Sequence, residues 1–111
     1  IEYRAKLREK VATLIQDLSS FSERLELEIA LIADKSDVTE ECVRLKSHIK
    51  FFRNTIENDS EVGRKLNFIC QEMHREANTI ASKSISMEVT KFSVLIREEI
   101  EKIREQIQNI E

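Results

Sequence analysis

The chain contains no proline and only one glycine, Gly63, within 111 residues. Tight hairpin turns depend on glycine, and most other turns are enriched in glycine or proline, so the chain has little material for a β-sheet. Charged residues make up 35% of the sequence, a fraction that suits the exposed faces of long helices. We therefore expect an all-α fold made of a few long helices.

Apolar residues recur at spacings of three and four in four successive segments, separated by short polar stretches. Because short connections favour antiparallel neighbours, we expect an up-and-down bundle of about four helices, with long first and last helices that extend partly beyond it. The serines of Ser19–Ser22 leave open a break in the first helix. The expected helices run from about Arg4 to Ile32, Asp37 to Ile56, Ser60 to Lys83 and Ser86 to Ile110.

The heptad seam of the first helix is expected at Leu7, Val11, Leu14, Leu18, Phe21 and Leu25. In the second helix the expected core positions are Cys42, Leu45, Ile49, Phe52 and Ile56. Its start is expected at Asp37, because Glu40 follows at the spacing of a capping box. Ser84 or Ser86 is the expected cap of the last helix, whose seam runs from Val89 to Ile110.

The composition also narrows the class of protein. A net charge of −3 argues against a free-standing nucleic-acid binder that works through a general basic field, although it allows a local basic patch. Cys42 and Cys70 lack CxxC spacing, so we expect buried free thiols rather than a disulfide. No apolar run reaches the roughly 20 residues of a membrane span, and no signal peptide is evident. We expect a cytoplasmic protein with no membrane partner.

The third segment, Ser60–Lys83, carries more polar residues of mixed chemistry than helix packing alone requires. Its apolar residues from Val62 to Ile80 lie on one side of a helix, so any chemistry is expected on the other side. A helical face with both charge signs and planar donors and acceptors can bind phosphates and a metal ion together. The residues on this side are Arg64, Lys65, Gln71, Glu72, His74, Arg75, Glu76, Asn78 and Lys83.

A polar row also lies on the second helix, where Asp37, Glu41, Arg44 and His48 follow one another at spacings of four, three and four. The row combines carboxylates, a guanidinium and an imidazole. Taken alone, the row favours a solvated stripe of weak pairs, each worth about 0.2–0.5 kcal/mol.

The sequence VGRKLNFICQEMHREANTIASKS, at Val62–Ser84, resembles the signature of the YicC/YloC-like bacterial proteins. The segments Asp37–Ile56 and Ile103–Glu111 resemble other parts of that family, so the similarity covers most of the chain from about Arg24. The chain departs from the family at Asn67, where aspartate is common, and at Ala81, where glycine is frequent. Matching positions are Asp37, Glu40, Glu41, Arg44, His48, Gly63, Arg64, Lys65, Leu66, Phe68, Gln71, Glu72, Arg75, Glu76, Asn78, Thr79, Ser82 and Lys83.

This resemblance implies that residues 1–111 form a single helical domain, the C-terminal part of a longer chain whose N-terminal domain is missing. The start at Ile1, inside an expected helix, favours the same interpretation. The resemblance further implies an oligomeric endoribonuclease that cleaves single-stranded or structured RNA with the help of a divalent cation, Mg²⁺ or Mn²⁺. Its expected partners are RNA, the missing domain and other copies of itself, joined through apolar helix seams.

Roles for individual residues follow from the needs of phosphodiester cleavage. Glu72 and Glu76, four residues apart on one helical face, are expected catalytic residues and the expected metal ligands. His48 is the expected proton-transfer group, because imidazole exchanges a proton near neutral pH. Cations suited to RNA phosphates are Arg44, Arg64, Lys65, Arg75 and Lys83. Supporting polar residues are Asp37, Glu40, Glu41, Gln71, Asn78 and Thr79.

Other interpretations stay open for these residues. Glu72 and Glu76 fit an exposed pair bonded to Arg75 or to a neighbouring helix, and His48 fits a structural imidazole. The whole chain also fits a helical oligomerisation or RNA-clamp module whose catalytic site lies elsewhere, or a general coiled-coil scaffold. Convergence of the two polar faces on one concave site favours the catalytic hypothesis, whereas divergence favours the module.

Overall fold

The computed structural model describes residues 2–31, 36–58, 63–83 and 86–109, without the side chains of residues 2–4, 36 and 37. Its described part is almost entirely α-helical and contains no strand, which confirms the expected fold class. The predicted caps Asp59 and Ser60 and the apolar residues Ile32, Val62 and Ile110 lie outside it. The four helices are α1 (Glu2–Ala30), α2 (Ser36–Asn58), α3 (Gly63–Lys83) and α4 (Met87–Ile107).

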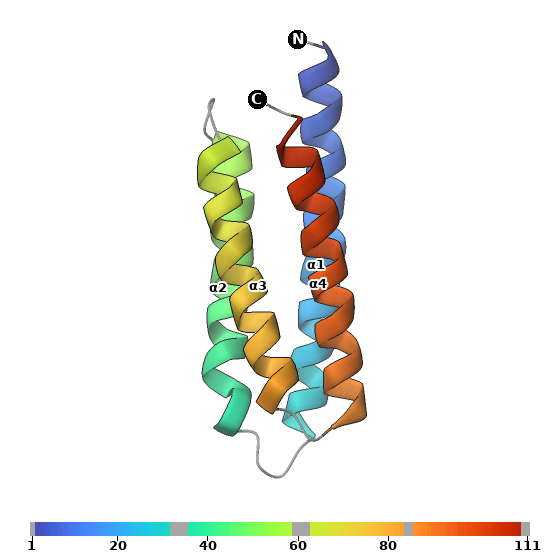
Figure 1. Ribbon diagram of the computed structural model, residues 1–111, viewed down its shortest axis with the longest axis vertical. Helices are drawn as coiled ribbons and strands as arrows, with labels where there is room; N and C mark the ends of the chain where they lie inside the picture. The colour runs from blue at the N-terminus through green and yellow to red at the C-terminus, as the bar shows by residue number, and fades with distance from the viewer. Residues whose placement is uncertain (1, 32–35, 59–62, 84–85, 110–111) are drawn as a thin grey trace.

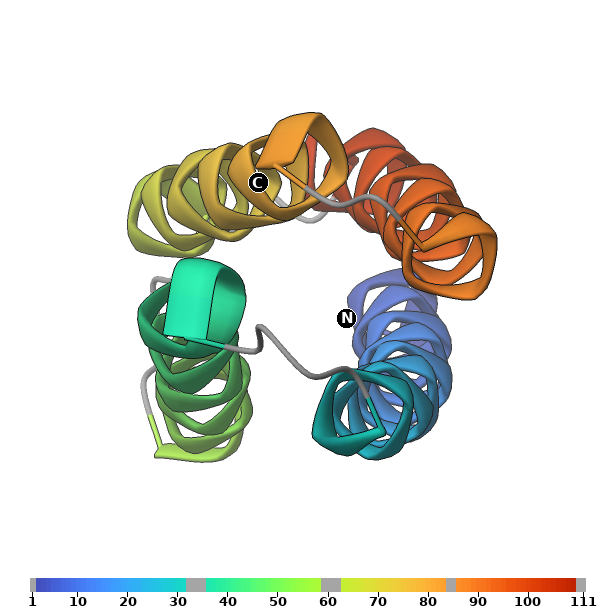
Figure 2. The same ribbon diagram turned by 90° about the horizontal axis from the view of Figure 1, so that it is seen from below.

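The helices run up and down in an elongated bundle that measures 50 × 18 × 18 Å (Figure 1). Seen along its axis, the bundle is a ring in which α1 packs against α2, α2 against α3, α3 against α4, and α4 against α1 (Figure 2). At about 1.5 Å per residue, the 29 residues of α1 span about 43 Å, and its first turns extend beyond the ends of the other helices. α4 has 21 residues, the same length as α3.

The seam of α1 differs from the predicted one at two positions. The buried line runs through Ile15 and Ser22, whereas the predicted Leu14 and Phe21 are only partly buried and pack at its edge. A heptad seam is recognised in a sequence by its apolar residues, so the polar Ser22 was not predicted to belong to it. The serines of Ser19–Ser22 do not break the helix, since α1 is continuous through them.

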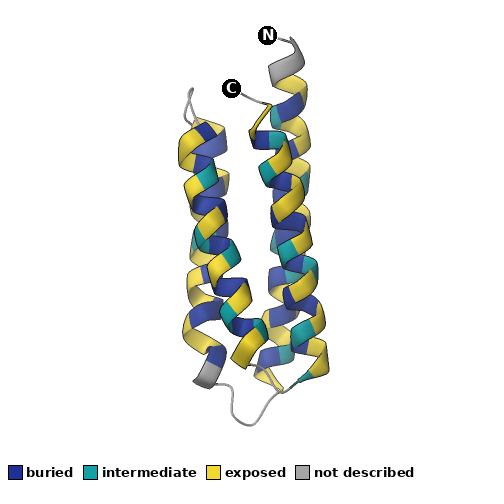
Figure 3. Ribbon diagram, in the orientation of Figure 1, coloured by how far each residue is buried: buried dark blue, intermediate teal, exposed yellow. Residues whose placement is uncertain are grey.

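The predicted cores of the other helices are confirmed wherever the structure describes them. Alternating buried and exposed residues are visible along each helix in Figure 3, with the buried faces turned toward the bundle interior. The buried apolar residues of these three helices include Cys42, Leu45, Ile49, Phe52, Ile56, Leu66, Ile69, Met73, Ala77, Ile80, Val89, Phe92, Ile96, Ile100, Ile103 and Ile107.

Helix starts agree with the sequence in one case and differ in another. Ser86 caps α4, and its hydroxyl accepts a hydrogen bond from the backbone N–H of Val89 at 3.3 Å. α2 begins at Ser36, one residue earlier than predicted, so Asp37 lies within its first turn rather than at the cap.

Both cysteines are free and buried, as predicted. Burial raises the pKa of Cys42 to about 11 and that of Cys70 to about 12, because the thiolate is poorly solvated inside the bundle. Both thiols therefore stay protonated at neutral pH and act as small apolar groups. Within the described residues, no helix has the length and apolar character needed to cross a membrane.

Two neighbouring residues of α2 provide a test of the core. Leu45 is fully buried, whereas Val43 is 62% exposed. We expect Leu45→Ala to lower the free energy of unfolding by about 2–5 kcal/mol, because it leaves a cavity, and Val43→Ala to change it by less than about 0.5 kcal/mol. Urea denaturation followed by circular dichroism measures both; equal losses would contradict the assigned core.

Candidate functional site

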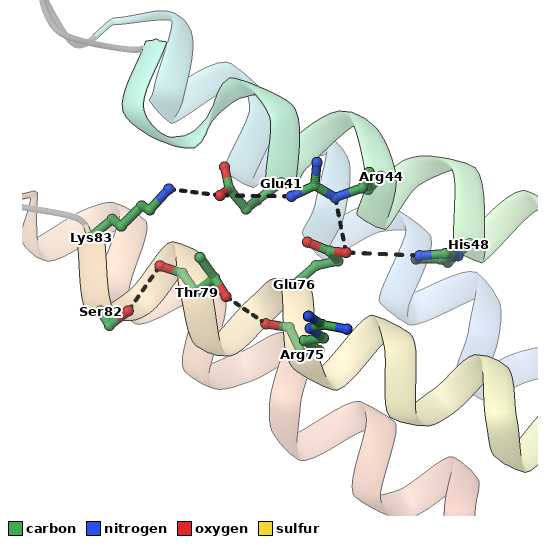
Figure 4. A network of polar contacts seen from close by, with 8 residues as sticks. All are labelled: Glu41, Arg44, His48, Arg75, Glu76, Thr79, Ser82 and Lys83. Carbon is green, nitrogen blue, oxygen red and sulfur yellow. Dashed lines mark hydrogen bonds and ion pairs between the residues drawn. The ribbon is translucent and has the colours of Figure 1, made fainter.

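Five side chains from α2 and α3 meet along the seam between these two helices (Figure 4). Because the helices are antiparallel neighbours, the polar row of α2 lies alongside polar residues of α3. We call this group the Glu76 cluster. Its members are Glu41, Arg44, His48, Glu76 and Lys83.

Glu76 lies at the centre of the cluster and is only 6% exposed. Its Oε2 accepts a hydrogen bond from Arg44 Nε at 3.0 Å and lies 3.9 Å from Nε2 of His48. The bond to Glu76 raises the pKa of Arg44 above its usual range, so the guanidinium is firmly charged. A carboxylate is stable in so buried a place only when a cation and hydrogen bonds compensate its lost hydration.

Glu41, on α2, is the second buried carboxylate of the cluster. Lys83 Nζ donates a hydrogen bond to its Oε2 at 2.8 Å, and the same oxygen lies 3.7 Å from Nη2 of Arg44. The hydrogen bond from Lys83 lowers the pKa of Glu41 below its ordinary value of 4.5, and it outweighs the opposing effect of burial. Arg44 therefore bridges both carboxylates.

The cluster exposes its cations and buries its anions. The side chains of Arg44 and Lys83 are each 48% exposed, whereas those of Glu41 and Glu76 are less than 10% exposed. An anion that approaches from solvent therefore meets a guanidinium and an ammonium group first. The imidazole of His48 lies beside them and is 27% exposed. This arrangement suits a phosphate group, since phosphate is commonly bound by guanidinium and ammonium groups.

The burial of the two carboxylates corrects the sequence-based interpretation, which placed Glu41 and Glu76 on outer polar faces. Each lies at the edge of the apolar face of its helix, on the side that faces the neighbouring helix. For Glu76 a signal was present in the sequence, because Met73, Ala77 and Ile80 surround it at helical spacing. The sequence does not show which cation on another helix would pair with such a residue, so it does not predict the buried ion pair.

The other predicted polar residues are more dispersed. Glu72 is half-buried one turn before Glu76 and makes no ion pair with a described residue, while Thr79 donates a hydrogen bond to the carbonyl oxygen of Arg75 at 3.0 Å. Asn78 bonds to His74 at 3.0 Å, outside the cluster. The side chain of Asp37 lies outside the described residues. The exposed residues among them are Glu40, Gln71, Arg75 and Asn78.

The five predicted phosphate-binding cations do not form one group. Arg64 and Lys65 lie near the start of α3, and about 18 residues, or about 27 Å of helix, separate them from Lys83.

The ammonium group of Lys65 instead lies 5.8 Å from the centre of the Phe51 ring, across the same seam. Sequence reasoning missed Phe51; its signal was the Phe51-Phe52 pair, of which only one ring can face the core.

A divalent metal has limited support from the side chains. No group of three or more His, Cys, Asp or Glu residues suited to a metal ion is found among the residues that the structure describes. Mg²⁺, however, is commonly held by one or two carboxylates, with water and substrate phosphates completing its shell. Glu72 and Glu76, four residues apart on α3, fit that smaller requirement.

The described surface is hollowed in other places. A groove of about 650 Å³ lies between α1 and α2, with Ser22, Glu26, Lys46 and Arg53 in its lining. It shares no residue with the Glu76 cluster. The cluster lies on the seam between α2 and α3, away from this groove.

Together, the fold and the seam define the chain as a helical-bundle domain with a charge-paired, anion-accessible surface between two of its helices. Comparison of the sequence with known families identifies it further. The family described as "Endoribonuclease YicC-like, C-terminal" matches residues 1–111, so the chain belongs to this family. This confirms the resemblance that the sequence of α2 and α3 indicated.

Two relatives carry the same name, "Probable endoribonuclease YicC". The protein from Clostridioides difficile (strain 630) is 52% identical over 111 residues, which cover 99% of this chain and 38% of that protein. The protein from Haemophilus influenzae is 43% identical over 106 residues, which cover 94% of this chain and 37% of that protein. The chain therefore spans less than two-fifths of the length of these relatives.

The lowered pKa of Glu41 predicts a dependence of stability on pH. Its ion pair with Lys83 contributes stability above about pH 4.5, and this contribution is lost as the pH falls through the lowered pKa of the folded state. Glu41→Gln should therefore be less stable than the unmodified protein at neutral pH, and the difference should shrink in acid. Denaturation from about pH 7 to 3 measures this, with exposed Glu40→Gln as control; a pH-independent difference would refute it.

Proposed function

We propose that this chain contributes the Glu76 cluster as a catalytic centre to an endoribonuclease that cleaves RNA phosphodiester bonds. The observation that carries the proposal is Glu76 itself, a buried carboxylate that holds an arginine and lies beside a histidine at one solvent-accessible seam. The family to which the chain belongs, and the names of the two relatives, support RNA as the substrate.

Binding of the scissile phosphate falls to Arg44 and Lys83. Each donates a hydrogen bond to a buried carboxylate, and the side chain of each is 48% exposed. Arginine offers five donors in a planar fork, so Arg44 can bind Glu76 and a phosphate oxygen at the same time. Cations held in place before the substrate arrives stabilise the charge that develops on the phosphate oxygens.

Proton transfer falls to His48. Its imidazole is partly exposed, the neighbouring Leu45 and Ile49 are buried in the core, and Glu76 lies 3.9 Å from one ring nitrogen. A carboxylate at that distance attracts the ring N–H and restrains the orientation of the imidazole. Glu76 thus acts as a positioning residue for both Arg44 and His48, and His48 delivers a proton to the leaving oxygen.

We further propose Glu72 and Glu76 as the side chains that hold a divalent cation, Mg²⁺ or Mn²⁺. Such an ion would supply Lewis-acid stabilisation of the phosphate. The proposal rests on the i,i+4 carboxylate pair and on the fact that Glu72 has no ion-pair partner among described residues. We also propose that other subunits or the rest of the full-length, cytoplasmic protein complete the site.

Cleavage of a labelled RNA by the natural full-length protein tests the catalytic roles. We expect His48→Ala and Glu76→Gln to reduce the rate at least about 100-fold, the lower range for loss of proton transfer. His74→Ala and Glu98→Gln, exposed or half-exposed residues outside the cluster, should keep the full rate. Circular dichroism and sedimentation of each variant control for folding and assembly.

An unchanged rate in both cluster variants would favour a second function. The described part of the chain also exposes several large apolar side chains, among them Leu27, Leu31 and Met87, which suit contacts with other protein surfaces. In that case the chain is a helical oligomerisation or RNA-clamp module, and the catalytic site lies elsewhere in the full-length protein.

Metal binding has its own readout. We expect Mn²⁺ titrated into the protein, and followed by its electron paramagnetic resonance signal, to bind in the absence of RNA and to bind at least about tenfold more weakly to Glu72→Gln. Glu98→Gln is the matched control on another helix. Equal binding by both variants would exclude Glu72 as a metal ligand and would not bear on the role of His48.

A further inference from the structure

Two phenylalanines of the α2–α3 seam are exposed, although other phenylalanines of the chain are buried in its core. Phe51 is 48% exposed and Phe68 is 61% exposed, whereas Phe52 and Phe92 are buried. A single exposed apolar residue needs no explanation. Two large aromatic rings on adjacent helices, beside a cluster of charged groups, form a surface with a specific chemistry.

The two rings lie on the same side of the bundle as the Glu76 cluster. On α3, Lys65, Phe68, Glu72 and Glu76 follow one another at spacings of three, four and four, which places them on one helical face. On α2, Phe51 follows His48 by three residues.

The contact between Lys65 and the Phe51 ring, at 5.8 Å, joins the two faces across the seam. Phe68 lies eight residues, or about 12 Å of helix, from Glu76. The rings are therefore a continuation of the cluster along the seam, and not a separate patch.

This combination of groups matches single-stranded nucleic acid. Unpaired bases stack on aromatic side chains, while the phosphates between them contact nearby cations. Lys65 and Arg64 supply exposed cations at the aromatic end of the seam, and Arg44 and Lys83 supply them at the other end. Phenylalanine has no hydrogen-bonding groups, so such stacking would be tolerant of base identity.

We propose that Phe51 and Phe68 form a base-stacking subsite that holds unpaired nucleotides of an RNA next to the phosphate bound by the Glu76 cluster. The proposal rests on the proposed function for its ligand and adds a second contact for it. Bases inside a duplex are stacked on one another and cannot occupy the subsite, so it selects RNA that is locally single-stranded. Charge complementarity and continuity with the cluster favour RNA over a protein surface as the occupant.

Binding experiments on the natural full-length protein can separate stacking from charge. Fluorescence anisotropy would compare a labelled single-stranded RNA with a ribose-phosphate chain of the same length that lacks bases, each checked on a gel to be intact. We expect Phe51→Leu and Phe68→Leu each to weaken RNA binding about five- to tenfold and to leave binding of the base-free chain unchanged.

Leucine keeps an apolar side chain, so its effect reports loss of the aromatic ring. Phe51→Trp should retain RNA binding, and Val43→Ala, an exposed apolar residue of α2 outside the seam, is the matched control.

Three outcomes would overturn the subsite. RNA binding unchanged in both leucine variants would exclude stacking, and equal loss with both polymers would indicate a general defect. A change in subunit number on sedimentation, with RNA binding retained, would assign the rings to contact with another copy of the chain. Failure of the proposed catalysis is a separate result, because His48→Ala changes cleavage whereas the leucine variants are judged on binding alone.

Discussion

Two buried carboxylates between α2 and α3 determine most of what is distinctive about this bundle. Glu41 and Glu76 are removed from water, and each must be compensated by a cation from the opposite helix. Arg44 compensates Glu76, and Lys83 compensates Glu41, so the two pairs cross the seam in both directions. These pairs fix the register of α2 against α3 more narrowly than apolar side chains alone, which tolerate small shifts of one helix along another.

The same pairs give the seam its outward chemistry. The apolar residues behind them hold the two helices together, and the carboxylates bind the cations, while the side chains of Arg44 and Lys83 remain about half exposed. Along the seam, the charged cluster passes into an aromatic surface made by Phe51 and Phe68. One line of contact between two helices therefore combines exposed cations, an imidazole and aromatic rings.

The sequence predicted the helices and most core residues well, because apolar periodicity is a local property. It failed where a position depends on a neighbouring helix. Ser22 is polar and yet occupies the seam of α1, which displaced the predicted Leu14 and Phe21 to its edge. Glu76 looked exposed because its partner, Arg44, is 32 residues away in the chain. The separation of Arg64 and Lys65 from Lys83, by contrast, follows from the predicted helix itself, since about 18 residues of one helix lie between them. The family resemblance supplied the candidate residues but not their arrangement.

The bridge that Arg44 forms between both carboxylates also limits how such a seam can change in evolution. Replacing Arg44 leaves a buried Glu76 without its hydrogen-bonded cation, and replacing Glu76 leaves the guanidinium without the acceptor that orients it. Each single substitution therefore produces a less stable protein. Glu41 and Lys83 are coupled to the same pair, because Glu41 also contacts Arg44. These four residues are expected to be retained together, and to be substituted together when the seam takes on another role.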